Sequence, residues 1–196
     1  MTTTSILLAA LLGLGLSAST GLNTFLPLLL FSAAARFNIA GITLGDKFDW
    51  LASDAAIVGL IIASIIEIVG DKVPAVDHFL DSIGTFMRPL AASLGTAAAF
   101  TGVDVDPTVA AIAGIIIGAP TSLGLHSLKA GTRVVSSGTT LGCANPVLSL
   151  IEDVVSFGLT VISIFAPILV PIALAVLVFF LWRIMKRMRA RPAEEV

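Results

Sequence analysis

The sequence has very little charge for its length. Charged residues make up only 12% of the 196 residues, whereas a soluble domain usually has about 25%. Hydrophobic residues make up 57%, and the mean hydropathy is +1.04. Such a chain cannot cover a folded surface with polar groups, so much of its surface must face lipid. The composition therefore predicts an integral membrane protein.

Several chemical features are missing or scarce. A single cysteine, Cys143, excludes an internal disulfide and leaves the redox compartment undetermined. With two histidines, His78 and His126, and no paired cysteines, a dedicated transition-metal site is disfavoured. The sequence contains no GxSxG, HExxH or P-loop motif, and its start, MTTTS, lacks the basic region of a signal peptide. We therefore expect a protein that is not an enzyme and that requires no cofactor or metal.

Long uncharged runs are present instead. They cover residues 1–35, 107–128, 134–151 and 154–182. Because roughly 20 apolar residues cross the hydrocarbon layer as a helix, these runs are long enough to span a membrane. We predict an all-α polytopic membrane bundle of about five or six spans with broken or re-entrant helices.

Glycine, proline and polar clusters predict where the helices end. A first helix over residues 4–36 should be interrupted at 17–23 (SASTGLN), and residues 37–51 should form an interfacial loop with Trp50 at headgroup level. A second span should cover residues 52–70. A helix starting at Pro74 should be bent or divided by Pro89, and DVDP (104–107) should form a turn. The next helix, from near Thr108, should end or break at 131–133, and a closing helix should reach about 188 with Pro167 and Pro171 inside it.

The basic residues are concentrated at the end of the chain. Five of the eleven lie in RIMKRMRAR, at Arg183, Lys186, Arg187, Arg189 and Arg191. Basic clusters beside a membrane helix stay in the cytoplasm. This pattern predicts one membrane domain over residues 1–182 and a basic cytoplasmic tail over 183–196.

A repeat with an offset of 72 residues underlies the chain. Gly70, Pro74 and Asp81 align with Gly142, Pro146 and Asp153. The repeat divides the membrane domain into halves of about 1–103 and 104–182, as in transporters whose broken helices meet near the membrane midplane. If the repeat is real, Asp81 and Asp153 should approach a common cavity.

The most unusual stretch is VGDKVPAVDHFLDSIGTFMRP (69–89). Asp77, Asp81 and Arg88 share one face of the helix predicted there, and Glu67 and Asp71 are likewise four residues apart. Each charge at the centre of a membrane helix costs about 2.5–3.5 kcal/mol. We therefore expect these residues to face each other or water, with Lys72, His78 and Arg133 as further partners.

The second half has fewer charges. Asp153 and Ser149 occupy the positions that correspond to Asp81 and Asp77, whereas Glu152 points elsewhere and can face Arg133 or Lys129. Residues 126–142 are too polar for a lipid-facing helix, so they should line a cavity or contact the other half. His126 itself is expected to be a hydrogen-bonded interior histidine.

The two polar stretches resemble a family of small bacterial integral membrane proteins known as a domain of unknown function. The matching elements are an E-x3-DKxP-x2-D-x3-D-x6-RP core at 67–89, then AGTR (130–133) and N-x3-S-x2-ED from Asn145 to Asp153. SSGTTLGCAN stands where the family is expected to have a more polar, proline-containing stretch. The resemblance implies a multi-pass membrane fold and no particular activity.

The sequence predicts a transporter or channel for a small polar solute or ion, with proton coupling through Asp77, Asp81 and Asp153. Alternatives are a non-transporting membrane scaffold or assembly protein, and translocation of a lipid-linked headgroup. The expected partners are the lipid bilayer, the solute or ion, and further copies in a homo-oligomer, but not nucleic acid. The candidate solute-binding residues are Asp77, Asp81, Arg88, Asp153, Glu67, Asp71, Lys72, Arg133, Glu152, Ser149 and Asn145.

Overall fold

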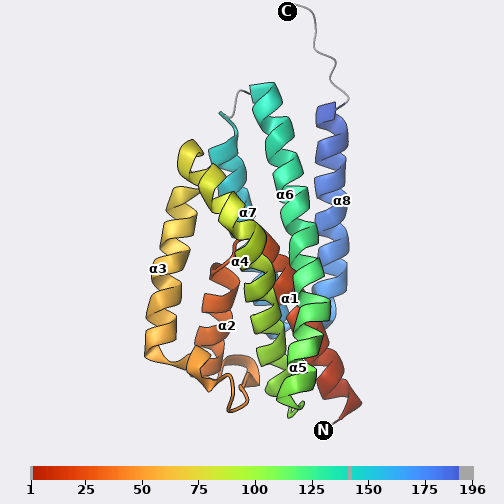
Figure 1. Cartoon of the computed structure of the whole chain (residues 1–196). Helices are drawn as coiled ribbons and strands as arrows, with labels where there is room; N and C mark the ends of the chain where they lie inside the picture. The colour runs from red at the N-terminus through yellow and green to blue at the C-terminus, as the bar shows by residue number, and fades with distance from the viewer. Residues whose placement is uncertain (1, 141–142, 190–196) are drawn as a thin grey trace, which may run out of the picture.

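The computed structural model describes residues 2–140 and 143–189, which form helices and connecting loops without strands (Figure 1). The longer helices are α1 (Thr3–Leu22), α3 (Asp54–Gly70), α4 (Pro74–Thr101), α6 (Ala119–Thr140), α7 (Asn145–Phe165) and α8 (Val170–Arg189). The shorter elements are α2 (Leu26–Arg36), α5 (Pro107–Ala113), a π-helical segment η3 (Gly114–Gly118), and the 3-10 turns η1 (Ile39–Gly41), η2 (Asp49–Ala52) and η4 (Pro167–Leu169). The predicted all-α class is confirmed.

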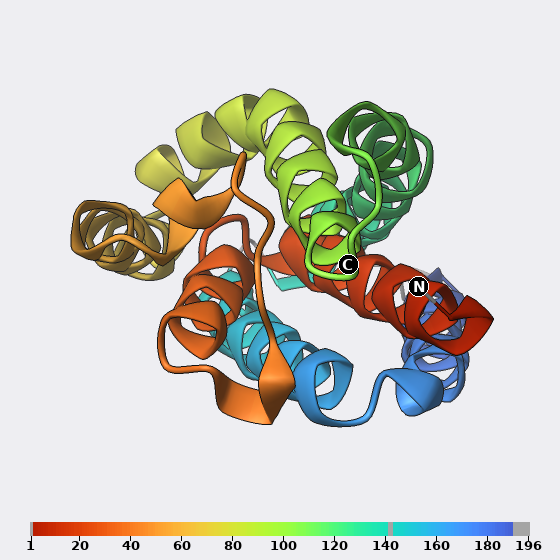
Figure 2. The ribbon, with the colours of Figure 1, turned by 90° about the horizontal axis from the view of Figure 1, so that it is seen from below.

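The helices form a bundle around α1. Seen from below, α1 lies in the middle and contacts α4, α6 and α7, whereas α3 lies at the periphery (Figure 2). The start of α1 and the end of α8 lie at opposite ends of the bundle (Figure 1).

Four helical stretches are long and apolar enough to cross a membrane. They are Thr3–Leu22, Pro107–Gly138, Asn145–Phe165 and Pro167–Lys186. α3, with 17 residues, runs beside them and exposes isoleucines at 61, 62, 65 and 66, as a lipid-facing helix would. The sequence predicts five or six spans, and the spans beyond these four stay a prediction.

Local chemistry explains where the helices start. Ser53 caps α3 by accepting a hydrogen bond from the Ala56 N–H, and Asp106 caps α5 by accepting from the Thr108 and Val109 N–H groups. Pro74 and Pro146 lie in the first turns of α4 and α7, where a missing N–H costs nothing. The predicted starts of these helices and the turn before α5 are confirmed.

The first helix is interrupted as predicted, but only from Asn23, the last residue of the predicted stretch 17–23, because α1 continues to Leu22. The hydroxyls of Ser17, Ser19 and Thr20 donate to carbonyls four residues earlier in the same helix, so these polar residues are satisfied without leaving it. The chain leaves the helical path only at Asn23, whose φ and ψ are −137° and 125°, and α2 begins at Leu26. The break is thus shorter and later than expected.

Two further helix boundaries differ from the prediction. α6 continues through residues 131–133 to Thr140, and its Arg133 is paired within the bundle. The closing helix is instead two, since α7 ends at Phe165 and α8 begins at Val170. Pro167 cannot donate the next helical hydrogen bond, and Ala166 before it adopts φ −145°. Pro89, by contrast, lies inside α4 without dividing it.

Candidate functional site

A buried group of charged side chains occupies the half of the bundle that contains the start of α4. We call it the charged network, and it consists of Glu67, Asp71, Lys72, Asp77, Asp81, Arg88, Lys129, Arg133, Glu152 and Asp153. These residues come from α3, α4, α6, α7 and the turn between α3 and α4. Charges that are distant in sequence are therefore brought into mutual contact inside an apolar bundle.

Arg133 of α6 joins most of the carboxylates. Its Nη2 donates to Glu152 at 2.8 Å and to Asp71 at 3.5 Å. Its Nη1 donates to Asp77 and, at 3.4 Å, to Asp81. One guanidinium thereby separates Asp77 from Asp81, which would otherwise repel each other at this helical spacing.

Arg88 of α4 is fully buried and forms the second centre of the network. Its Nη2 contacts Glu67 at 3.5 Å and Asp81 at 3.4 Å, and its Nη1 contacts His126 Nδ1. Because a guanidinium can only donate, His126 Nδ1 accepts, which assigns the ring proton to Nε2 beside Thr85 Oγ1 at 3.2 Å. His126 is thus the hydrogen-bonded interior histidine that the sequence predicts.

The break between α1 and α2 is held by two opposite charges. Glu67 accepts from the backbone N–H groups of Thr24 and Phe25, at the positive end of α2. Lys129 Nζ donates to the Leu22 carbonyl at 2.9 Å, at the negative end of α1. The unpaired backbone groups of both helix ends are therefore satisfied by side chains of the network.

Asp153 joins the network from the other side of this break. Lys72 Nζ lies 3.2 Å from one carboxylate oxygen of Asp153, and Asn23 Nδ2 donates to the other at 2.9 Å. Asn23 Oδ1 in turn accepts from the Leu26 N–H at 3.1 Å. The helix break, α7 and the turn after α3 are linked through these contacts.

The charges of the network do not balance. Six carboxylates face four basic side chains, counted over the described residues. An uncompensated charge in a membrane interior is expensive. The arrangement therefore favours the uptake of protons or cations over the uptake of anions.

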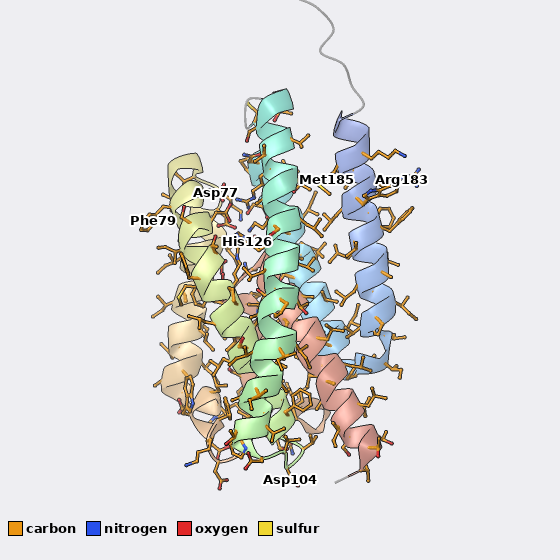
Figure 3. The ribbon with its side chains drawn as sticks, turned by 45° about the vertical axis from the view of Figure 1, so that its right-hand side comes forward. Asp77, Phe79, Asp104, His126, Arg183 and Met185 are labelled. Atoms are coloured by element: carbon orange, nitrogen blue, oxygen red, sulfur yellow. The ribbon has the colours of Figure 1, made fainter. Side chains whose placement is uncertain are left out.

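A cavity of about 460 Å³ borders the network between α4, α6 and the start of α7. Its walls carry Asp77, Asp81, Ser82, Thr85, His126, Ala130, Arg133, Val134, Ser137 and Asn145. Figure 3 shows Asp77 and His126 on the neighbouring helices α4 and α6, in the half away from Asp104. The polar part of α6 thus lines a cavity, in agreement with the prediction for residues 126–142, of which 141 and 142 lie outside the described residues.

The family model described as "Domain of unknown function (DUF4126)" matches residues 10–187. The chain belongs to this family. Searches of curated proteins and of solved structures give no match. The match covers the whole charged network and the cavity, so both are features of the matched region of this DUF4126 protein.

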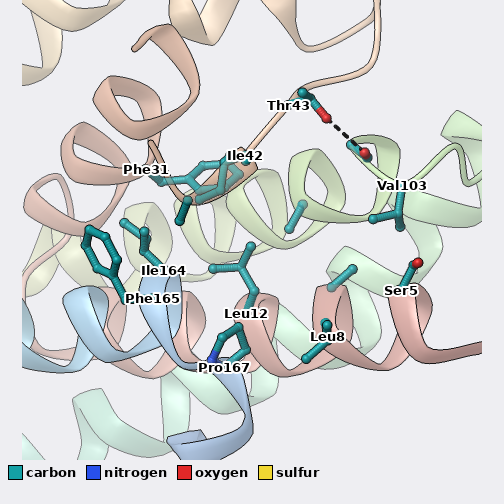
Figure 4. Close-up of a pocket in the computed structure, with 15 residues that line it drawn as sticks. Ser5, Leu8, Leu12, Phe31, Ile42, Thr43, Val103, Ile164, Phe165 and Pro167 are labelled. Atoms are coloured by element: carbon teal, nitrogen blue, oxygen red, sulfur yellow. Dashed lines mark hydrogen bonds between the residues drawn. The ribbon is translucent and has the colours of Figure 1, made fainter. Parts of the chain in front are cut away.

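A second cavity, of about 320 Å³, lies at the opposite end of this DUF4126 protein (Figure 4). It is lined mainly by apolar side chains, among them Leu12, Phe31 and Ile164, and Thr43 Oγ1 donates to the Gly102 carbonyl at its rim. Deeper in the bundle lie buried hydroxyls. They belong to Ser17, Ser19, Thr20, Thr96, Ser156, Thr160 and Ser163. Each of these hydroxyls donates to a backbone carbonyl, so the polar groups are satisfied inside the bundle.

Nine of the eleven predicted site residues meet in the charged network. The other two are Ser149, which is fully buried and whose Oγ has no partner among the described residues, and Asn145, which lines the cavity and donates to Ser137 Oγ at 3.1 Å. Asp81 lines the cavity, whereas Asp153 does not. The common cavity expected for these two aspartates is therefore not observed, although both belong to one network.

The sequence reasoning missed the residues of the helix break. Asn23 was considered only as part of the helix interruption, Thr24 was not considered, and Lys129 was considered only as a partner of Glu152. The signal available in the sequence was the polar pair Asn23 and Thr24 inside the uncharged run 1–35. The side chain of His78 lies outside the described residues, and among those described no group of three or more His, Cys, Asp or Glu could hold a metal ion.

Proposed function

We propose that this DUF4126 protein is a membrane transporter or channel for a small polar solute or ion, coupled to proton movement through Asp77, Asp81 and Asp153. The observation that carries the proposal is the buried charged network beside the 460 Å³ cavity. A protein that only crosses the bilayer does not need ionised groups there, and such residues usually mark a substrate or ion pathway.

The helix break supports the proposal because it resembles the discontinuous helices of transporters. Glu67 and Lys129 each hold one side of the break and also bind other charges of the network. A solute or proton that changes the pairing of Asp81 acts on Glu67 through Arg88. The cavity and the break are thereby coupled through one arginine.

The alternatives receive less support. For a lipid-linked headgroup, a phosphate would need a free arginine, yet the terminal nitrogens of Arg88 and Arg133 all have partners. For a scaffold, complete pairing of the charges would suffice. The excess of carboxylates and the cavity beside Asp81 favour transport over that role.

The proposal also covers the location of the protein, its orientation in the membrane and its internal repeat. The protein lies in the cytoplasmic membrane of a bacterium with its basic end in the cytoplasm, and its halves are related by the 72-residue repeat. The end of the bundle away from the end of α8 has only two basic residues among those described, Arg36 and Lys47, which supports this orientation, because basic loops stay in the cytoplasm. Its charged residues are Arg36, Asp46, Lys47, Asp49, Asp54, Asp104 and Asp106.

A flux assay in liposomes tests the proposal. Purified protein would be reconstituted with a pH-sensitive dye inside, and inorganic cations, inorganic anions and small neutral solutes would be added in turn under an imposed pH gradient. We expect protein-dependent flux of at least one class that changes with the gradient. Protein that is folded but gives no flux of any class would instead support the scaffold.

A further inference from the structure

The carboxylates of the network that borders the 460 Å³ cavity differ in how exposed their side chains are and in how closely basic groups approach them. The side chain of Asp81 is 21% exposed, compared with 11% or less for the other carboxylates of the network. Its contacts to Arg88 and Arg133 are both 3.4 Å. Asp81 is therefore the most exposed carboxylate of the network, and its two ion pairs are both long.

The cavity does not offer a positive charge to a ligand. Arg133 lines it, but its terminal nitrogens are occupied by Asp71, Asp77, Asp81 and Glu152. Arg88 is fully buried behind the wall and binds Thr24, Glu67, Asp81 and His126. An anion would have to displace a carboxylate, whereas a cation meets Asp81 directly.

The size and the other wall residues favour an organic cation. A volume of about 460 Å³ lies within the range of small-molecule pockets. A divalent metal ion is usually held by several carboxylate, imidazole or thiolate ligands, and no group of three or more His, Cys, Asp or Glu that could hold one exists among the described residues. The walls add neutral polar side chains, among them Thr85, Ser137 and Asn145. They also add the apolar side chains of Ala130 and Val134.

We infer that this cavity binds a small protonated amine, with the ammonium group paired to Asp81 and a short hydrocarbon part against Ala130 and Val134. An alkylammonium group donates up to three hydrogen bonds, which suits a wall of acceptors with one open carboxylate. The inference rests on the proposed function for the transport step, and it names the substrate class of the same site.

Thermal unfolding of the purified protein in detergent tests binding without requiring flux. Propylammonium chloride, sodium chloride and sodium propionate would be compared at one ionic strength, so that the amine, the inorganic cation and an anion of similar size are separated. We expect a saturable rise of the melting temperature with propylammonium only. The rise should vanish in Asp81→Asn and persist in Asp46→Asn, which changes an exposed loop carboxylate.

A second variant keeps the test decisive if Asp81→Asn fails to fold. Ala130→Leu fills part of the cavity without changing a charge and should weaken propylammonium binding at least tenfold. Equal shifts in all three salts, a shift with propionate, or propylammonium binding that survives both variants would overturn the inference. Propylammonium binding without flux of any solute would contradict only the transport function, and flux of an anion or neutral solute without amine binding would contradict only the amine site.

Discussion

Glu67 of α3 accepts hydrogen bonds from both the backbone N–H and the hydroxyl of Thr24, at 2.9 and 2.7 Å, where α2 is about to begin. The same carboxylate lies 3.5 Å from Arg88 Nη2. A helix start inside the bundle is thus joined to a buried arginine through one side chain. Because the helix break and the ion pairs depend on the same residue, stability and function are expected to be linked here.

Glu67→Gln should lower the free energy of unfolding by about 3 kcal/mol, because it removes one partner of a buried charge pair. The amide nitrogen of glutamine cannot accept the hydrogen bond that Glu67 accepts from Thr24. Thermal or denaturant unfolding in detergent would measure the loss. Asp54→Asn is the control, since it breaks an exposed pair with Arg36 and should cost about 0.5 kcal/mol. Equal losses in the two variants would refute the role of Glu67.

Gly118→Ala should destabilise the bundle by about 1–3 kcal/mol. A Cβ at this position would lie 2.7 Å from the Ala92 carbonyl oxygen of α4, so the two helix backbones would have to separate. Gly124→Ala on α6 has no atom of a neighbouring element within 4 Å and should be neutral or stabilising by up to about 1 kcal/mol. The melting temperatures of the two variants give the comparison, and a destabilised Gly124→Ala would argue against this packing.

Asp81→Asn should abolish flux or its pH dependence while the protein still folds, because asparagine keeps the shape but cannot bind a proton. In a purely structural network, Asp81→Ala would be expected to unfold the protein by leaving Arg88 buried and unpaired. The structure changes this expectation, since Arg88 also contacts Glu67, Thr24 and His126. Both variants should therefore insert and fold. Normal pH-dependent flux from folded Asp81→Asn protein would eliminate the coupling role.

Labelling with a membrane-impermeant maleimide should reveal the orientation. Cys143 is exposed and follows the end of α6, at the same end of the bundle as the end of α8. If that end is cytoplasmic, Cys143 reacts in inverted membrane vesicles and not in intact cells. Asp46→Cys in a Cys143→Ser background should show the opposite pattern, because its loop lies at the other end. Labelling of both cysteines from one side would contradict the arrangement.

Much of the candidate site could be predicted from the sequence because charge is so scarce in it. In an apolar chain each buried ion needs a partner, so Asp77, Asp81 and Arg88 on one helical face already implied a paired interior cluster. Pairings within α4, such as Asp81 with Arg88, follow from helical spacing. Between helices, the predicted pairing of Glu152 with Arg133 or Lys129 is confirmed. Other interhelical pairings, such as Lys72 with Asp153, depend on how the helices pack and could not be assigned.

The helix boundaries likewise separate into those that follow from local sequence and those that depend on packing. Pro74 and Asp106 predicted helix starts correctly because their effect is local, acting on the N–H groups of a single turn. The hydroxyls of Ser17 and Thr20 were misread as breakers, because whether they donate to their own helix or elsewhere depends on burial. Local signals were reliable only where no neighbouring helix competed.

The sequence by itself determined that this is an all-α protein with membrane-spanning helices and that its few charges must be paired or hydrated, since hydrophobicity and helical periodicity are properties of the chain alone. Only the tertiary structure decided which charges meet. Arg133 became a shared partner of four carboxylates, and Lys129 and Glu67 came to hold the two ends of a broken helix. Ion pairing and cavity shape depend on distances between helices that are far apart in sequence, and packing alone sets those distances.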